Sequence, residues 1–237
     1  MVWRLRKSVI GLLALSGLAL GLGAVFSAQM GTTAALSTLA GRKVIIDPGH
    51  GGKDPGAVGY GGREDHVVLA ICRDLKQDLT RSGLTVILTR NSHVDLLNGQ
   101  GGTKKLELAK RIEMVNASGA DAFLSIHANA GTSSAWRGAQ VFVDQKASPA
   151  SKTLGQKIQE ALQREVGTTR KLNQGINHYL LKNSTIPAAT VEVGFMTNPQ
   201  ESRLLQSAAY QRRLALAITH GVLDYFGTPV AGRRGGG

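Results

Sequence analysis

The chain has 237 residues, of which 42% are hydrophobic and 5% are aromatic, and this length and composition suit one packed α/β domain with additional terminal segments. Its formal net charge of +12 allows nucleic acid, an anionic membrane face, a cell-wall polymer or plain solvent as the neighbour of a basic surface. The single cysteine, Cys72, excludes an internal disulfide and a cysteine-rich zinc site.

The N-terminal segment, residues 1–28, combines positive charge with a long apolar run. Arg4, Arg6 and Lys7 precede residues 9–26, which carry no charge. A helix of this length approaches the ~30 Å hydrocarbon core of a bilayer. The segment is therefore a signal peptide or an uncleaved anchor, and its length favours an anchor that attaches the chain to the membrane. The positive-inside rule then places the rest of the chain outside the cytoplasm, which argues against a nucleic-acid partner.

Three further segments follow along the chain. Residues 29–41 form a short uncharged linker, residues 42–227 the catalytic domain, and residues 228–237 a glycine-rich tail that we expect to be flexible. Within the domain, runs typical of strands alternate with runs typical of helices. Strands are expected at 43–47, 85–89, 122–126, 139–143, 178–181 and 189–193, and helices at 64–82, 104–118, 151–166 and, in one or two pieces, 199–226. This alternation predicts a single α/β domain whose mostly parallel, twisted sheet carries helices on both faces, with the site at the carboxyl ends of the strands.

The first chemically informative motif is the run from Ile46 to Gly56. Its prolines and glycines make a rigid turn that can aim one side chain. His50 is the residue of this turn that offers ring nitrogens, and the run does not match a phosphate-binding loop.

Two further candidates lie near the starts and ends of expected elements. Glu64 opens a helix, where an acidic residue is also favoured by the helix dipole alone, and Asp65 and His66 compete with it for a ligand role. His127 directly follows an apolar strand; a lone histidine there is often a satisfied core residue, but its pairing with His50 favours a shared site.

Glu192 lies within the apolar strand 189–193. An acid at such a position is costly to bury unless it is paired or serves a site. One explanation is a buried ion pair with an arginine. The other is a proton-transfer role beside a metal, in which the carboxylate takes a proton from water and passes it to a leaving amine.

At these four residues the chain closely resembles the zinc-dependent N-acetylmuramoyl-L-alanine amidases. The resemblance covers residues 44 to about 226 and rests on four motifs, which here read DPGHGG (47–52), EDHV (64–67), SIHANA (125–130) and EVGFMTN (192–198). It implies a Zn²⁺ ion held by His50, Glu64 and His127, with Glu192 as the catalytic acid and base. His66 departs from the family pattern, which has an acid there. Asn129, beside one ligand, is a candidate substrate-binding residue or a turn residue.

Within that family the chain looks most like the germination-specific members that act on spore cortex. Residues 99–116 and 168–183, the N-terminal segment and the absence of wall-binding repeats carry this likeness. It implies hydrolysis of the amide bond between N-acetylmuramic acid and L-alanine, in cortex maturation and formation of muramic lactam. It also implies peptidoglycan as the partner and an exported location at the wall or cortex, with other protein partners unspecified.

Two alternatives to the amidase interpretation stay open at the level of sequence. A zinc peptidase that cuts the stem peptides of the same polymer would use the same metal chemistry. An inactive, membrane-tethered wall-binding protein would lack zinc or the acid, and both histidines and Glu192 are present.

Overall fold

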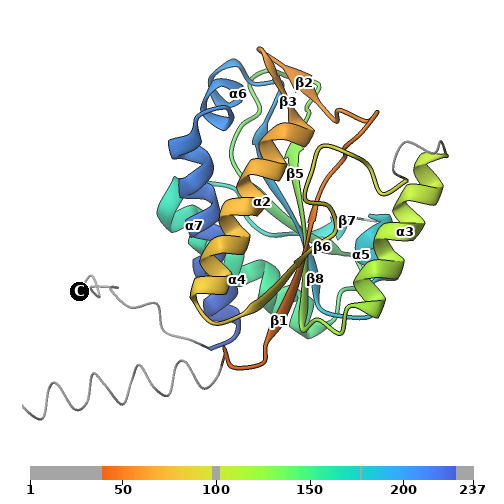
Figure 1. Ribbon diagram of the computed structural model, residues 1–237. Coiled ribbons are helices and arrows are strands. Elements are labelled where there is room, and N and C mark those ends of the chain that lie inside the picture. Colours follow the sequence, from red (N-terminus) through yellow and green to blue (C-terminus); the bar gives the residue numbers. More distant parts are fainter. Residues whose placement is uncertain (1–38, 98–101, 177, 228–237) are drawn as a thin grey trace, which may run out of the picture. The chain divides into compact units, whose positions relative to one another are not determined.

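The six-stranded sheet at the centre of the domain is mostly parallel. The computed structural model describes residues 39–97, 102–176 and 178–227 (Figure 1). The strands are β1 (Lys43–Pro48), β4 (Thr85–Leu88), β5 (Ala122–Asn129), β6 (Gln140–Asp144), β7 (Asn173–Ile176) and β8 (Ala188–Phe195), in the order β4-β1-β5-β8-β6-β7. Strands β4, β1, β5 and β8 run parallel, whereas β6 pairs with β8 antiparallel and with β7 parallel.

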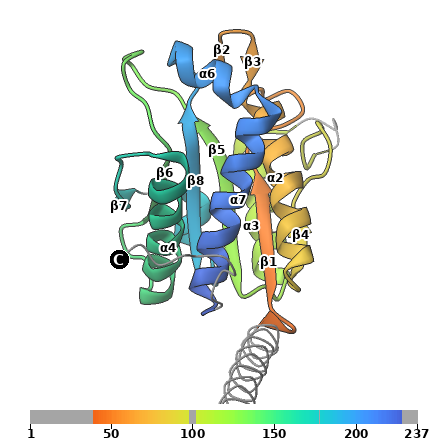
Figure 2. The same ribbon diagram turned by 90° about the vertical axis from the view of Figure 1, so that its left-hand side faces the viewer.

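Helices cover both faces of this sheet. Helices α2 (Glu64–Arg81), α4 (Pro149–Val166) and α7 (Ala208–Tyr225) lie together on one face, and α3 (Lys104–Ala117) and α5 (Tyr179–Asn183) lie on the other (Figures 1 and 2). Side chains alternate along β1, so that Val44 and Ile46 pack under the first layer while Ile45 packs against α3. The predicted α/β domain with a mostly parallel sheet and helices on both faces is confirmed.

The ends of several helices follow local sequence signals. Thr103 caps α3 by accepting a hydrogen bond from the backbone of Leu106, and Ser148 caps α4, which has a proline in its first turn. Asn198 caps the short helix α6 (Pro199–Leu205), so that the predicted helical region 199–226 consists of two pieces.

Two elements differ from the sequence-based expectation. Residues 178–181, predicted as a strand, begin helix α5, and the strand of this region is β7. A run this short fits either a strand or a helix turn. In the structure Leu180 and Leu181 both pack on the same core cluster, which adjacent residues of a strand cannot do. A small hairpin of β2 (Val58–Gly59) and β3 (Gly62–Arg63), which precedes α2, was not anticipated.

The terminal segments lie mostly outside the described residues. Leu39 onward forms one compact unit, whereas the predicted anchor at 1–28, most of the linker at 29–41 and the tail at 228–237 are not described, and their boundaries stay predictions. No helix within the described ranges combines the length and the apolar character needed to cross a membrane.

Candidate metal centre and active site

The turn after β1 is held from below by two buried arginines. Arg90 donates to the carbonyl oxygens of Pro48 at 2.9 Å and Gly49 at 2.6 Å. Arg111 donates to the carbonyls of Pro48 at 2.9 Å and His50 at 2.6 Å. His50 itself adopts a left-handed backbone with φ of 60°, which costs energy for a residue with a side chain. The arginines therefore fix a strained turn that directs the His50 ring.

Buried carboxylates balance the charge of Arg111. Its guanidinium lies 2.6 Å from Asp47 and 2.5 Å from Glu107. Asp47 also accepts hydrogen bonds from Thr89 and Ser125. Burial lowers the pKa of Arg111, but these carboxylates outweigh burial and raise it. The arginine thus stays charged beneath the turn. A buried charge is tolerated there because it is paired with carboxylates and its hydrogen bonds are satisfied.

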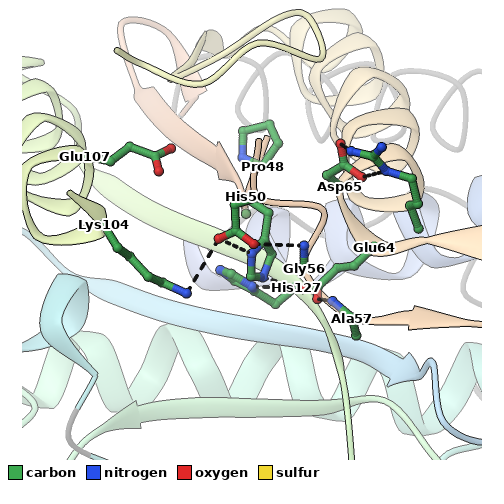
Figure 3. A network of polar contacts seen from close by, with 12 residues as sticks. Pro48, His50, Gly56, Ala57, Glu64, Asp65, Lys104, Glu107 and His127 are labelled. Carbon is green, nitrogen blue, oxygen red and sulfur yellow. Dashed lines mark hydrogen bonds and ion pairs between the residues drawn. The ribbon is translucent and has the colours of Figure 1, made fainter. Parts of the chain in front are cut away.

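Glu64 brings the two candidate histidines together. It is the first residue of α2, and its Oε1 lies 3.1 Å from His50 Nε2 and 3.0 Å from His127 Nδ1 (Figure 3). The two imidazole rings meet edge to face, with centroids 4.9 Å apart. Burial raises the pKa of Glu64, but the hydrogen bonds with His127 and His50 outweigh burial and hold it well below the usual value. Glu64 is therefore an ionised carboxylate between two imidazoles.

Neighbouring groups orient these three side chains. The other ring nitrogen of His50, Nδ1, lies 2.9 Å from Asp54 Oδ2, which leaves Nε2, the nitrogen that faces Glu64, as its ligand atom. Burial lowers the pKa of His50, but Glu64 and Asp54 outweigh burial and raise it. The Glu64 carboxylate accepts backbone hydrogen bonds from Ala57 on Oε2 and from Ala128 on Oε1. Sequence reasoning missed Asp54, although a carboxylate four residues after His50 in a rigid turn was a usable signal.

Two glycines leave room for the cluster. A Cβ atom added to Gly49 would lie 2.3 Å from Cε1 of His127, and one added to Gly56 would lie 2.5 Å from Oε2 of Glu64. Both distances are far below van der Waals contact. The glycines of the first motif are thus required for close approach to the ligand side chains as well as for turn formation.

Glu192 lies on β8 opposite His127 on β5. Its Oε2 is the one buried side-chain nitrogen or oxygen atom without a hydrogen-bond partner among the residues that the structure describes. Burial raises the pKa of Glu192 to about 7, and the charge of Glu64 acts in the same direction against the opposing effect of the histidines. The group can therefore accept and release a proton near neutral pH, and no arginine pairs with its buried oxygen.

These residues fit a divalent transition-metal ion. His50, Glu64 and His127 each offer one ligand atom, and these atoms all lie within 4.8 Å of one another. Two imidazoles and one carboxylate form a donor set of catalytic zinc sites. Glu192 beside them has a buried oxygen without a partner. Such an oxygen is explained if it contacts a bound water or substrate.

The remaining predicted residue and the surrounding space complete the site. Asn129 ends β5 two residues after His127, past a register shift, and its backbone oxygen accepts a hydrogen bond from Met196; its substrate role stays a prediction. A small cavity of about 80 Å³ touches His50 and His127. A larger one of about 460 Å³ adjoins it and shares three lining residues with it, Asp54, Lys104 and Glu107.

Sequence reasoning also missed His178, the residue that precedes α5. Burial and the nearby His127 both lower its pKa, so it presents a neutral imidazole near the site. Its proximity to His127 joins residues that are far apart in sequence, and no local pattern signals it.

An α/β domain that brings two imidazoles and two carboxylates, one of them with a raised pKa, together at one end of its sheet is typical of hydrolases. The sequence matches the family described as N-acetylmuramoyl-L-alanine amidase over residues 44–224. The germination-specific N-acetylmuramoyl-L-alanine amidase of Bacillus subtilis is 39% identical over 193 residues, which cover 79% of this chain and 81% of that protein. The amidase AmiA of Escherichia coli is 31% identical over 230 residues, covering 78% and 76%.

Solved structures agree with these sequence matches. The CwlD amidase of Clostridioides difficile, solved in complex with the GerS lipoprotein, superposes with a TM-score of 0.74 at 36% identity and covers 79% of this chain and 100% of that one. The catalytic domain of CwlV from Bacillus (Paenibacillus) polymyxa gives a TM-score of 0.69 at 29% identity, covering 79% and 99%. The chain belongs to the N-acetylmuramoyl-L-alanine amidase family and hydrolyses the amide bond between N-acetylmuramic acid and L-alanine in peptidoglycan. This membership favours the amidase over the peptidase and wall-binding alternatives.

Proposed function

We propose that this amidase depends on a zinc ion held by His50, Glu64 and His127, and that Glu192 is its catalytic acid and base. The observation that carries the proposal is the convergence of one ligand atom from each of the three residues to within 4.8 Å. They come from a turn, a helix start and a strand that are distant in sequence. The buried, unpartnered oxygen of Glu192 beside them supports the second assignment.

A zinc ion bound there would supply Lewis acidity for the scissile carbonyl and for an attacking water. Glu192 takes the proton from that water as the water attacks the lactyl carbonyl of N-acetylmuramic acid. The same carboxyl then donates the proton to the nitrogen of L-alanine, which leaves as a free amine. A pKa of about 7 suits both directions of this transfer, because each form of the carboxyl is accessible at neutral pH.

The larger cavity is the proposed location of the stem peptide. It adjoins the ligand His50 through the shared residue Asp54, and Lys53 and Lys104 line it. Lys104 Nζ lies 3.5 Å from Asp54 and is otherwise well exposed. The lining combines these ammonium groups with the carboxylates of Asp54, Asp95 and Glu107, so the cavity suits a peptide that carries groups of both charges. Asn129, two residues after His127 at the end of β5, is proposed to contact the same substrate.

Relatives named as cell wall amidases support a reaction outside the cytoplasm. We further propose that residues 1–28 attach the chain to the membrane and that its substrate is spore cortex, in maturation or germination. The B. subtilis relative, named germination-specific, supports the second proposal. The C. difficile relative was solved with a lipoprotein, and this supports a search for a membrane-attached protein partner of this chain.

Digestion of purified peptidoglycan and of cortex tests this function. Products are identified by mass spectrometry with and without a chelator, and after restoration of Zn²⁺. We expect stem peptides with a free L-alanine amine and glycan strands with free lactyl groups, both abolished by the chelator and restored by zinc. Peptides cut between two amino acids would support the peptidase instead. Undiminished cleavage by metal-free protein would contradict the zinc proposal alone.

A further inference from the structure

A second group of side chains suited to metal binding lies beside the active site and takes no part in it. Asp65, His66 and His93 each offer one ligand atom, and these atoms all lie within 4.8 Å of one another. The rings of His66 and His93 are in contact, with centroids 4.2 Å apart. His66 Nε2 lies 3.7 Å from Asp65 Oδ2. His66 is also the position at which the chain departs from its family pattern.

We propose that Asp65, His66 and His93 bind a second divalent metal ion, such as Zn²⁺, Ni²⁺ or Cu²⁺. Two imidazoles and one carboxylate are ligands that these metals prefer to the oxygen-only sets of Mg²⁺ and Ca²⁺. Both histidines are exposed, whereas Asp65 is buried, so the ion has an open path from solvent and a fixed anion at its base. The remaining coordination positions would be filled by water.

Arg63 holds the Asp65 carboxylate in place for this role. Its Nε donates to Oδ1 at 2.9 Å and its Nη2 donates to Oδ2 at 3.0 Å. Each carboxylate oxygen has two acceptor sites, so Oδ2 keeps one toward the histidines. Partners behind a ligand commonly fix its direction in this way. The two sites share no ligand, and in Figure 3 Asp65 lies apart from the His50–Glu64–His127 group.

His93 presents its ring from an exposed segment, where solvent and a metal ion can reach it. An imidazole without its second proton has the lone pair that a metal requires.

The second site joins two segments that surround the catalytic turn. Asp65 and His66 belong to the first turn of α2, directly after Glu64, and His93 belongs to the segment 89–97 that follows β4. The carbonyl of His93 accepts a 2.6 Å hydrogen bond from the backbone of Gly52, within the turn that carries His50. A Cβ on Gly52 would lie 2.3 Å from Asp95 Oδ2, which shows how closely the segment packs on that turn.

A bound ion would therefore tie the first turn of α2 to the segment that supports the His50 turn. In this role it acts as a cross-link on the frame of the active site, without contacting the substrate. We expect slower exchange of backbone amides in residues 64–67 and 91–97 when the ion is bound.

Metal stoichiometry of the untagged, full-length protein tests the proposal. The metal-stripped protein is equilibrated with micromolar Zn²⁺, and bound zinc is counted after dialysis. Wild type is expected to hold two ions per chain, and His66→Ala and His93→Ala one each. His220→Ala is the matched control, because His220 on α7 pairs with Glu165 on α4 and belongs to neither cluster; it should retain two ions.

The double variant His50→Ala/His127→Ala separates this proposal from the proposed function. It should lose the catalytic ion and retain one ion, and hydrogen exchange at 91–97 should still slow on zinc addition. That retained ion must then disappear when His93→Ala is added. A single ion in the wild type, or a second ion that persists in both His66→Ala and His93→Ala, would overturn the second site. Failure of His50→Ala/His127→Ala to lose an ion would instead contradict the catalytic assignment.

Discussion

Glu192 on β8 is the register partner of His127 on β5. Two neighbouring parallel strands in the middle of the sheet therefore hold a candidate metal ligand and a candidate proton carrier side by side. Because both are backbone-fixed by the strand pairing, their separation does not depend on a mobile loop. This rigidity suits groups that must keep a fixed geometry around a reacting amide.

Replacement of Glu192 by glutamine should abolish turnover while leaving zinc bound. Loss of a positioned acid and base typically lowers the rate by about 10²–10⁴-fold. Release of peptide from peptidoglycan measures activity, and metal analysis measures zinc. Glu160→Gln on α4, where the exposed carboxylate only meets Lys157 and Gln156, is the matched control. A Glu192→Gln protein that keeps most of its activity would refute the assignment.

The stability of the metal-free protein should fall as pH rises from about 4.5 to about 7. Burial raises the pKa of Glu192 from 4.5 to about 7, so the folded state keeps a proton that the unfolded state has lost within this window. The favourable contribution is present below the unfolded pKa and is lost as pH rises through the folded one, by about 3 kcal/mol in total.

Urea unfolding of chelator-treated wild type and Glu192→Gln at about pH 5 and about pH 8 measures this effect. Glutamine cannot ionise, so the variant should gain stability relative to wild type at the higher pH. An equal pH dependence of the two proteins would show that Glu192 titrates normally.

Asp54→Asn should weaken zinc binding. Asp54 accepts the Nδ1 hydrogen bond that fixes the His50 ring, and loss of such an outer partner commonly costs about 10–100-fold in metal affinity. Competition with a chromogenic chelator measures the affinity. Asp144→Asn is the control, since Asp144 caps a turn by accepting from Lys146 at the end of β6. Equal zinc affinities of the two variants would argue against the role of Asp54.

Arg111→Met should destabilise the fold far more than Arg42→Met. Arg111 is only 3% exposed and neutralises Asp47 and Glu107, so its removal leaves buried carboxylates unpaired, at a cost of about 3–5 kcal/mol. Arg42 pairs with Asp121 at a side-chain exposure of 49%, where an ion pair contributes about 0–1 kcal/mol. Denaturant unfolding compares the two, and similar losses would contradict the burial argument.

Gly49→Ala should lower zinc affinity and activity together. The new methyl group would lie 2.3 Å from the His127 ring, so the ring must leave the position in which it contacts Glu64. Gly175→Ala is the control, because its Cβ would meet nothing closer than 3.5 Å. Zinc titration and peptidoglycan digestion measure both proteins; an unchanged zinc affinity in Gly49→Ala would show that His127 is not held where a ligand must be.

The order and type of most elements followed from sequence because they rest on local physics. The apolar spacing along α2 and the short apolar runs of β1, β5 and β8 are properties of neighbouring residues. Residues 178–181 were misassigned because a run as short as His-Tyr-Leu-Leu fits either a strand or a helix turn. Its packing on α3, a long-range contact, selected the helix.

The sequence by itself determined the candidate residues His50, Glu64, His127 and Glu192, because rigid turns, strand ends and an acid in an apolar strand are local features that a family resemblance then joined. Only the tertiary structure decided which atoms face one another. It assigned Nε2 of His50 through Asp54, placed Arg90 and Arg111 beneath the turn, and brought His93 to His66. These contacts join residues 4 to 64 positions apart, and their geometry is set by the pairing of strands and the packing of helices, which no short stretch of sequence specifies.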